Sequence, residues 1–323
     1  MFMGLKVLHI LVLPCFLSLL LSACAKELAF SEPTHTQLHL TLNYDGCVQM
    51  HEATKNTMTT GKMRYVIRTF PVGALNEHVD PVHELIVTED VQNGYNQTVT
   101  LGISPGDYQI LVWSDLVRDI DGVSCHNVDD FGEIYLLEGS AGNNDYRDAF
   151  RGRVSVSVPS GTDEAVSINV DMVRPLARFE LVSNDLAEFV GLQTVGSDRG
   201  FSLEDYTAMI YYVGYMPDTY SLYTDKPVDS ATGVIFSSPL REISDTEAAM
   251  GFDYVFVGDS GSSVYVRAGV YDKEGRQVSM TAPIKIPLQR NQTTLKRGNF
   301  LTSKSSDGIN IDQEMDGSFD IVL

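Results

Sequence analysis

Gln37-Leu38-His39-Leu40-Thr41-Leu42 is the stretch of sequence that decides the fold. Polar residues and leucines alternate along it, and successive side chains of a β-strand point to opposite faces of a sheet. Leu38, Leu40 and Leu42 therefore share one face, which predicts a strand with one side in a hydrophobic core. Residues 63–70 (MRYVIRTF), rich in aromatic and β-branched side chains, predict a second strand.

Two further pairs of alternating segments flank turn residues. Segments 99–103 and 108–114 flank Ser104-Pro105-Gly106-Asp107, and segments 154–158 and 165–170 flank Pro159-Ser160-Gly161. Proline followed by glycine fits the central positions of a type II turn, so we predict a β-hairpin over residues 99–114 and a second pair of strands over residues 154–170. The first half of the chain is thus predicted as a β-sandwich of short antiparallel strands.

The second half begins with a new strand after Pro175, and we place the domain boundary near Met172. A short helix is predicted over residues 184–189, with Ser183 or Asn184 as its N-cap. No long amphipathic segment occurs, which disfavours α/β folds. Further strands are predicted at residues 207–213, 253–257, 264–271, 283–287 and 319–323, with a hairpin loop at residues 272–275.

The overall composition excludes several classes of function. The 323 residues include 23 Lys and Arg against 43 Asp and Glu, which gives a net charge of −20, and 43% are hydrophobic. That apolar content is too high for a disordered acidic tail, and the length favours two domains. An excess of acidic residues argues against a nucleic acid partner, because binding a phosphate backbone requires a basic face.

The N-terminus is predicted to be an export signal. Lys6 precedes an uncharged apolar run over residues 7–21, too short to span a bilayer comfortably, and small residues follow. Leu21-Ser22-Ala23-Cys24 resembles a bacterial lipobox, which implies cleavage between Ala23 and Cys24 and acylation of the Cys24 thiol. Several acyl chains would anchor the protein stably to the outer membrane. The alternative is an ordinary signal peptide in which Cys24 happens to follow the cleavage site.

Two cysteines remain in the exported chain, Cys47 and Cys125. In an oxidising compartment they could form one disulfide, or they could stay as two unpaired thiols. Their spacing matches no metal-binding pattern. We therefore predict no metal site.

Catalytic signatures are absent, since the sequence has no GxSxG, HExxH, GxxxxGK[ST] or GxGxxG motif. The seven histidines occur singly, and we predict surface or loop positions for them. Trp113 lies within a predicted strand and is expected in the core. Exposed tyrosines such as Tyr211 and Tyr215 leave a glycan-binding surface open as an alternative. We predict no enzyme activity, catalytic residue or cofactor.

Several motifs resemble, in their order along the chain, the fimbrillin-related surface lipoproteins of Bacteroidota. After the lipobox come Leu42-Asn43-Tyr44, the turn at residues 104–108 leading to Val112-Trp113-Ser114-Asp115, and the segment 144–152 (NDYRDAFRG). In the second half the motifs are residues 174–179 (RPLARF), 251–257 (GFDYVFV), 287–291 (PLQRN), 298–302 (GNFLT) and 308–312 (GINID).

The resemblance implies an all-β, mainly antiparallel fold of two tandem transthyretin-like β-sandwiches with few short helices. The predicted organisation is a signal peptide at 1–23, a lipidated linker at 24–36, and domains at 37–172 and 173–323. It also implies contact with other fimbrial subunits by strand exchange, in which a protease removes the first strand and a neighbour's C-terminal strand fills the groove. The donor strand would use the apolar anchors Ile309, Ile311, Phe319, Ile321 and Leu323.

One departure from the family pattern concerns maturation, which in the best-known members requires an arginine just after the first strand. No arginine occurs here between Cys24 and Arg64, so cleavage would have to follow Lys55 or Lys62. We therefore favour a non-enzymatic, lipid-anchored, surface-exposed protein that keeps its first strand and serves in pilus anchoring or adhesion. The alternatives are a polymerising shaft or tip pilin and a glycan-binding surface lipoprotein.

Overall fold

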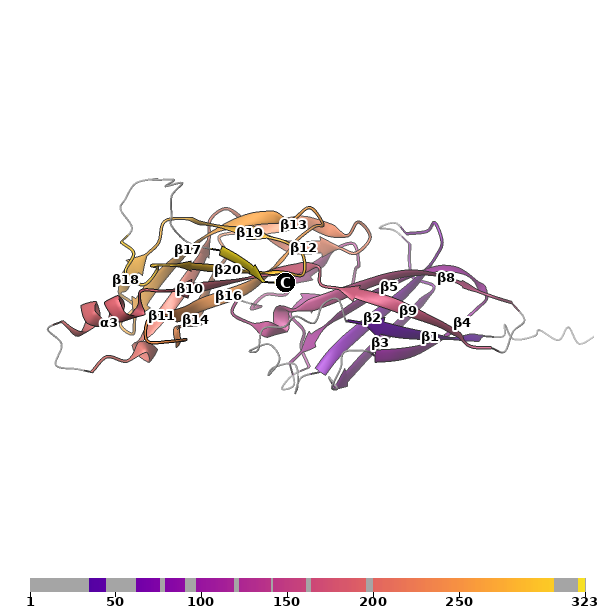
Figure 1. Ribbon diagram of the computed structural model, residues 1–323. Coiled ribbons are helices and arrows are strands. Elements are labelled where there is room, and N and C mark those ends of the chain that lie inside the picture. The colour runs from indigo at the N-terminus through magenta and orange to yellow at the C-terminus, as the bar shows by residue number, and fades with distance from the viewer. Residues whose placement is uncertain are drawn as a thin grey trace, which may run out of the picture. The chain divides into compact units, whose positions relative to one another are not determined.

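The structure is a computed structural model that describes residues 35–44, 62–75, 79–90, 97–118, 122–140, 142–160, 164–195, 200–304 and 319–322. It is all-β and mainly antiparallel with few short helices, which confirms the predicted fold class (Figure 1). From Thr36 onward the chain forms one compact unit. We name strands β1–β9 the N-terminal region and strands β10–β21 the C-terminal region; the domain boundary near Met172 stays a prediction.

The N-terminal region has a three-stranded and a four-stranded layer, continuous in the order β3-β2-β5-β8-β9-β1-β4. β8 and β9 pair only at Arg151↔Val173 and Gly152↔Met172, so the sheet divides there. Inward side chains of the two layers pack into one hydrophobic core, as expected for a sandwich. The strands are β1 (Thr36–Asn43), β4 (Gln97–Ile103) and β9 (Val166–Val173) in the first layer, and β2 (Lys62–Pro71), β3 (His83–Asp90), β5 (Gly106–Val117) and β8 (Ala149–Val158) in the second.

The predicted hairpin over residues 99–114 is wrong. β4 pairs with β1, whereas β5 pairs with β2 and β8, so the turn carries the chain from one layer to the other. Both strands bear an apolar face, and these faces pack across the core, where Leu101 and Ile110 belong to the same cluster. β8 and β9 likewise diverge into different layers after their short contact.

β2 and β5 are buried along most of their length, because both faces of these strands are covered. Val66, Leu111 and Trp113 point away from the sandwich core into a second cluster. The same cluster contains Tyr220 and Phe256 from the C-terminal region. Strands covered on both faces carry near-continuous apolar runs, which explains the composition of residues 63–70.

The C-terminal region has two sheets around a third core. One runs β15-β16-β10-β20-β21, and the other runs β14-β11-β17-β18 with β19 beside β17. Their strands are β10 (Leu176–Ser183), β15 (Arg241–Glu242), β16 (Ala248–Phe256), β20 (Thr293–Gly298) and β21 (Phe319–Val322), and β11 (Tyr206–Tyr212), β14 (Ile235–Pro239), β17 (Ser262–Asp272), β18 (Gln277–Met280) and β19 (Ile284–Leu288).

A fourth sheet joins the two regions in the order β13-β12-β7-β6. β12 of the C-terminal region pairs with β7 of the N-terminal region through Thr219↔Tyr135 and Tyr220↔Ile134. The two regions therefore share hydrogen bonds as well as a core. The strands are β6 (His126–Asn127), β7 (Ile134–Leu136), β12 (Tyr215–Ser221) and β13 (Lys226–Thr232), and the short 3-10 helices are η1 (Asp145–Arg147) and η2 (Leu203–Asp205).

The helix α3 (Leu186–Thr194) begins two residues later and runs further than predicted. Asp185 occupies the N-cap position without a side-chain cap hydrogen bond. Its carboxylate instead accepts hydrogen bonds from the backbone N–H groups of Leu301 and Thr302, at 3.3 and 2.9 Å. A distant segment of the chain thus takes the carboxylate that lies at the N-cap position of the helix.

Candidate functional site

The first strand, β1, lies inside a sheet with a partner on each side. It pairs antiparallel with β4 from Thr36↔Ile103 to Leu42↔Gln97, and parallel with β9 from Leu38↔Val166 to Asn43↔Asp171. Leu38, Leu40 and Leu42 are 0% exposed, as the alternation predicted. Without β1, the space between β4 and β9 would be a groove open to the apolar side chains of the sandwich core.

Tyr44 locks the far end of β1 to the opposite layer. Its side chain is buried, and its hydroxyl lies 2.8 Å from the Ser114 hydroxyl of β5. Its ring packs edge-on against Phe150 of β8, with centroids 5.1 Å apart. An aromatic pair of this geometry adds about 0.5–1.5 kcal/mol beyond the area it buries.

The outer face of β1 differs sharply from its inner face. His39 Nδ1 lies 2.9 Å from the Thr100 hydroxyl of β4, and Asn43 donates a hydrogen bond of 3.3 Å to Asp171 of β9. Both contacts are exposed to solvent. The strand is therefore held by its backbone ladders and by one apolar face.

The predicted donor segment falls largely outside the described residues, which exclude Ile309, Ile311 and Leu323. Phe319 and Ile321 lie in β21, which pairs antiparallel with β20 from Thr293↔Val322 to Lys296↔Phe319. The backbone of β21 thus adds to a sheet edge of its own chain. Its role as a donor strand stays a prediction.

The two candidate cleavage positions differ in what the structure shows. Lys62 is the first residue of β2 and is paired on both sides, with Asp90 of β3 and Val117 of β5. The next side chain, Met63, is buried. A protease that binds an extended substrate would have to unfold this strand first, which disfavours cleavage after Lys62. Lys55 lies outside the described residues.

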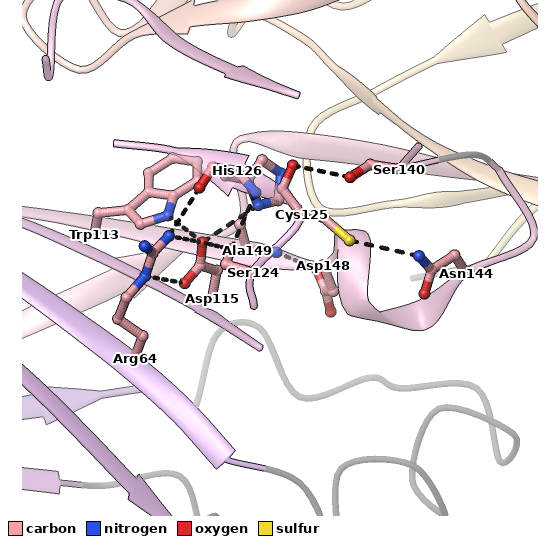
Figure 2. A network of polar contacts seen from close by, with 10 residues as sticks. All are labelled: Arg64, Trp113, Asp115, Ser124, Cys125, His126, Ser140, Asn144, Asp148 and Ala149. Atoms are coloured by element: carbon pink, nitrogen blue, oxygen red, sulfur yellow. Dashed lines mark hydrogen bonds and ion pairs between the residues drawn. The ribbon is translucent and has the colours of Figure 1, made fainter. Parts of the chain in front are cut away.

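The buried carboxylate of Asp115 in β5 organises a polar network next to Trp113, a member of the second hydrophobic cluster (Figure 2). Arg64 of β2 donates two hydrogen bonds to it, of 2.9 and 2.7 Å. Trp113 Nε1 and the Ser124 hydroxyl donate two more, of 3.0 and 2.6 Å, and His126 Nδ1 lies 3.3 Å away. One carboxylate therefore ties β2 and β5 to the segment that leads into β6.

The network sets the protonation state of its members. Burial would raise the pKa of Asp115, but the contacts with His126 and Arg64 outweigh burial and lower it to about 2. Burial lowers the pKa of His126, against the opposing effect of Asp115. Near neutral pH the pair is therefore a carboxylate beside a neutral imidazole. His126 is buried against Trp113 and Phe256. The predicted surface or loop position of this histidine is therefore wrong, because its side chain lies in the interior.

Two arginines connect the regions through buried ion pairs. Arg147 of η1 pairs with Asp253 of β16 and donates a 3.0 Å hydrogen bond to the Tyr254 carbonyl. Arg174, between β9 and β10, donates hydrogen bonds of 2.6 and 2.8 Å to the Asp148 carboxylate, which lies just after η1. Its third hydrogen bond, of 2.8 Å, reaches the Asn291 side chain just before β20.

Sequence reasoning missed these polar networks, because their members are far apart along the chain. Asp115 and Arg174 both lie in motifs that resemble the family, and this resemblance was the one sequence feature that could have indicated them.

Cys125 is buried, and Asn144 Nδ2 lies 3.4 Å from its sulfur. Because Cys47 lies outside the described residues, the disulfide stays a prediction. Ala23 and Cys24 are outside them too, so the predicted cleavage and lipidation also remain untested.

The aromatic residues considered for a glycan surface lie in different surroundings. Trp113 is fully buried, as predicted for a core residue, and cannot stack on a sugar. Tyr215 is 71% exposed, whereas the Tyr211 hydroxyl lies 2.8 Å from that of Tyr271. Among the described residues, no group of three or more His, Cys, Asp or Glu side chains is placed to hold a metal ion. No helix in this part of the chain is long and apolar enough to cross a membrane.

Comparison with known proteins gives one family and several similar folds. Residues 30–322 match a family described as of unknown function, DUF6562. Curated proteins give no match. Similar solved structures include the fimbrial anchor protein Mfa2 of Porphyromonas gingivalis, with 12% identity and a TM-score of 0.42 over 81% of this chain and 90% of that one.

Two more similar structures have comparable scores. The tip fimbrial protein Mfa3 of the same organism has 11% identity and a TM-score of 0.43 over 88% of this chain and 98% of that one. A Bacteroides thetaiotaomicron structure described as "putative polysaccharide binding proteins" has 10% identity and a TM-score of 0.49 over 81% and 92%. The two fimbrial proteins are of the kind that the sequence motifs resemble.

Proposed function

Because this chain belongs to DUF6562, a family of unknown function, we propose its role from the molecule itself: a non-enzymatic, lipid-anchored protein of the outer membrane. It faces the cell exterior and acts in pilus anchoring or adhesion through strand-mediated contact with other fimbrial subunits. Cys24 carries the lipid, and the C-terminal segment from Ile309 to Leu323 offers the strand to a neighbour.

The observation that carries the proposal is the position of β1 between β4 and β9, with its leucines in the sandwich core. A strand held by two backbone ladders and one apolar face is the arrangement that strand addition uses, in which main-chain hydrogen bonds give affinity and alternate side chains fill pockets. Leu38, Leu40 and Leu42 fill those pockets in the chain itself. The groove is therefore occupied, which supports an anchoring subunit rather than an acceptor in a growing polymer.

The pairing of Lys62 within β2 supports retention of β1 as well. Of the two candidates for the maturation step of a polymerising pilin, this pairing favours Lys55 over Lys62. A chain cut after Lys55 would lose the covalent link to β1, and the groove would become available to a neighbour's strand. That polymerising pilin is the second candidate function, favoured by the same groove.

Mass spectrometry of the N-terminus of the protein purified from outer membranes tests the proposal. We expect a chain that begins at acylated Cys24. A chain that begins at residue 56 or at residue 63 would overturn retention and favour the polymerising pilin. The matched variant Cys24→Ser should appear in the soluble fraction; equal membrane retention of this variant would overturn the lipid anchor.

A further inference from the structure

Both regions repeat one arrangement of their terminal strands. In the N-terminal region the first strand, β1, lies parallel to and directly beside the last strand, β9. In the C-terminal region the first strand, β10, lies parallel to and directly beside β20, from Arg178↔Thr293 to Ser183↔Gly298. All the other strand pairs among the described residues are antiparallel, so these two parallel pairs are a distinct feature.

Parallel pairing decides how tension along the chain acts on the strands. In a parallel pair, the start of one strand and the end of its neighbour lie at opposite ends of the ladder. Tension that enters at Thr36, the start of β1, and leaves at Val173, the end of β9, pulls the strands past each other along their axes. All the hydrogen bonds of the ladder then carry the load together. A hairpin pulled at its two free ends instead opens one bond at a time.

The same tension reaches the second pair through the connection between the regions. β9 leads through Arg174 and Pro175 directly into the start of β10. Once β21 has detached from β20, tension from the C-terminus leaves this region at Gly298, the end of β20, so β10 and β20 are also pulled past each other. The two parallel pairs are thus mechanically in series between the N-terminus and residue 298.

Specific side chains reinforce the far end of β1, the connection between the regions and the segment after β20. Tyr44 follows β1, so withdrawing β1 toward its N-terminus would pull a buried aromatic ring through the core. Arg174 binds the Asp148 carboxylate through two nitrogens at the connection between the regions. After β20, Asp185 accepts hydrogen bonds from Leu301 and from both the N–H and the hydroxyl of Thr302.

We propose that this chain is a load-bearing tether, in which β1–β9 and β10–β20 form two shear clamps in series. The tension itself would arise from the proposed function, on which this part of the proposal rests. A lipid at Cys24 would hold the chain before β1, while a bound subunit pulls from the C-terminal side. The clamps themselves depend only on the strand pairing. A purified protein without lipid should therefore show them.

Single-molecule force spectroscopy in two pulling directions tests the tether. The chain is residues 24–323 with Cys24→Ser and Cys47→Ser, which leaves the buried Cys125. In the first geometry, enzymatic handles at the two termini load both clamps in shear. In the second, one handle is N-terminal and the other is on Glu164→Cys, an exposed position just before β9, so β1 and β9 are pulled apart from their adjacent starts.

We expect a several-fold higher rupture force in the end-to-end geometry at the same loading rate, because forced unfolding follows the barrier along the pulling direction. Equal forces in the two geometries, or a higher force in the second, would overturn the proposal. Tyr44→Ala, which removes the buried ring, should lower the end-to-end force of the N-terminal clamp, while Tyr215→Ala, which removes an exposed ring outside both clamps, should leave it unchanged. Equal effects of the two variants would remove Tyr44 from the clamp.

This outcome is independent of the test of function. If native chains begin at residue 56, the lipid-anchored role fails, while the rupture force of the recombinant chain is unaffected. If native chains begin at acylated Cys24 and the two pulling geometries give equal forces, the anchor stands and the tether fails.

Discussion

The first strands of the two regions, β1 and β10, occupy equivalent positions but differ in burial. Each pairs parallel with the last or near-last strand of its region and antiparallel with a second strand. β1 alternates between buried and more exposed side chains, whereas every side chain of β10 is buried. On the outer face of β10, Arg178 bonds Glu180 at 2.9 Å and lies over the Phe252 ring at 4.2 Å.

This difference in burial indicates which of the two strands could leave its sheet at the lower cost in free energy. Withdrawing β1 would expose one hydrophobic core and would break solvent-exposed polar contacts on the other face. Withdrawing β10 would disrupt a core on one face and a buried ion pair on the other, and an unpaired buried charge costs several kcal/mol. The comparison therefore favours a removable first strand in the N-terminal region and not in the C-terminal region.

The largest expected effect comes from opening the two cores beneath these strands. Phe179→Ala in β10 should lower the free energy of unfolding by about 3–5 kcal/mol, and Leu40→Ala in β1 by about 2–5 kcal/mol, since both side chains are fully buried. Urea unfolding measures both. Hydrogen exchange should then show opening confined to β1 in Leu40→Ala and spread over the C-terminal region in Phe179→Ala. Identical exchange patterns would contradict the comparison.

Next in size is the loss of Asp115, which should destabilise the protein by about 3 kcal/mol. Asp115→Ala leaves Arg64, Trp113 and Ser124 without their shared acceptor, and the value sits at the low end for buried pairs because the Arg64 side chain is 21% exposed. Thermal and urea unfolding check it. Asp115→Asn, which keeps the shape and one acceptor, should cost less; an equal cost would show that the charge of Asp115 accounts for the whole effect.

The same carboxylate predicts how stability depends on pH. Its pKa is lowered from 3.8 to about 2 in the folded protein. Its stabilising contribution is therefore fully present above pH 4 and is lost as the pH falls toward 2. Unfolding free energies of the wild type and Asp115→Asn, measured over this range, should converge at the acid end. Parallel curves would contradict the assignment.

An effect of similar size, about 3 kcal/mol, is expected for Arg174→Met, which leaves the buried Asp148 carboxylate without its arginine and removes the hydrogen bond to Asn291. Because Arg174 lies where the two regions meet, its loss should also separate one calorimetric transition into two. Arg276→Met is the matched control, since this arginine forms exposed ion pairs with Asp272 and Glu274. A single transition in Arg174→Met would show that the shared core alone couples the regions.

The smallest effect is expected for Tyr44→Phe, about 1 kcal/mol, from the loss of one buried hydroxyl contact with Ser114. The ring and its contact with Phe150 remain. Limited proteolysis should detect faster release of β1 before global unfolding changes measurably. No change in the rate of proteolysis would contradict the role of Tyr44 as a lock.

How much of the molecule could be predicted depends on the range of the interactions. Strict alternation correctly predicted β1. The strands predicted at residues 63–70 and 264–271 fall within β2 and β17, and the one predicted at residues 283–287 overlaps β19. The turn at Pro105 was recognised, but which strands pair across it is decided by cores that form between distant segments. The same limit applies to β20, whose partner β10 lies over one hundred residues earlier.

The candidate site shows the same division. The inward leucines of β1 were predicted, because their periodicity is local. The carboxylate of Asp115 and the guanidinium groups of Arg147 and Arg174 were not, because the sequence shows a charge and not its burial. A buried polar network is specified by contacts between segments, and single-residue patterns contain no information about them.

One consequence concerns Gly152, at the point where β8 and β9 briefly pair. A methyl group added there would lie 2.5 Å from Val170 Cγ1 and 2.6 Å from the Met172 sulfur. Any larger residue would collide with these side chains where the sheet passes from one layer to the other, and would force the two layers further apart. The absence of a side chain at this one position thus sets how closely the two layers of the sandwich can pack against each other.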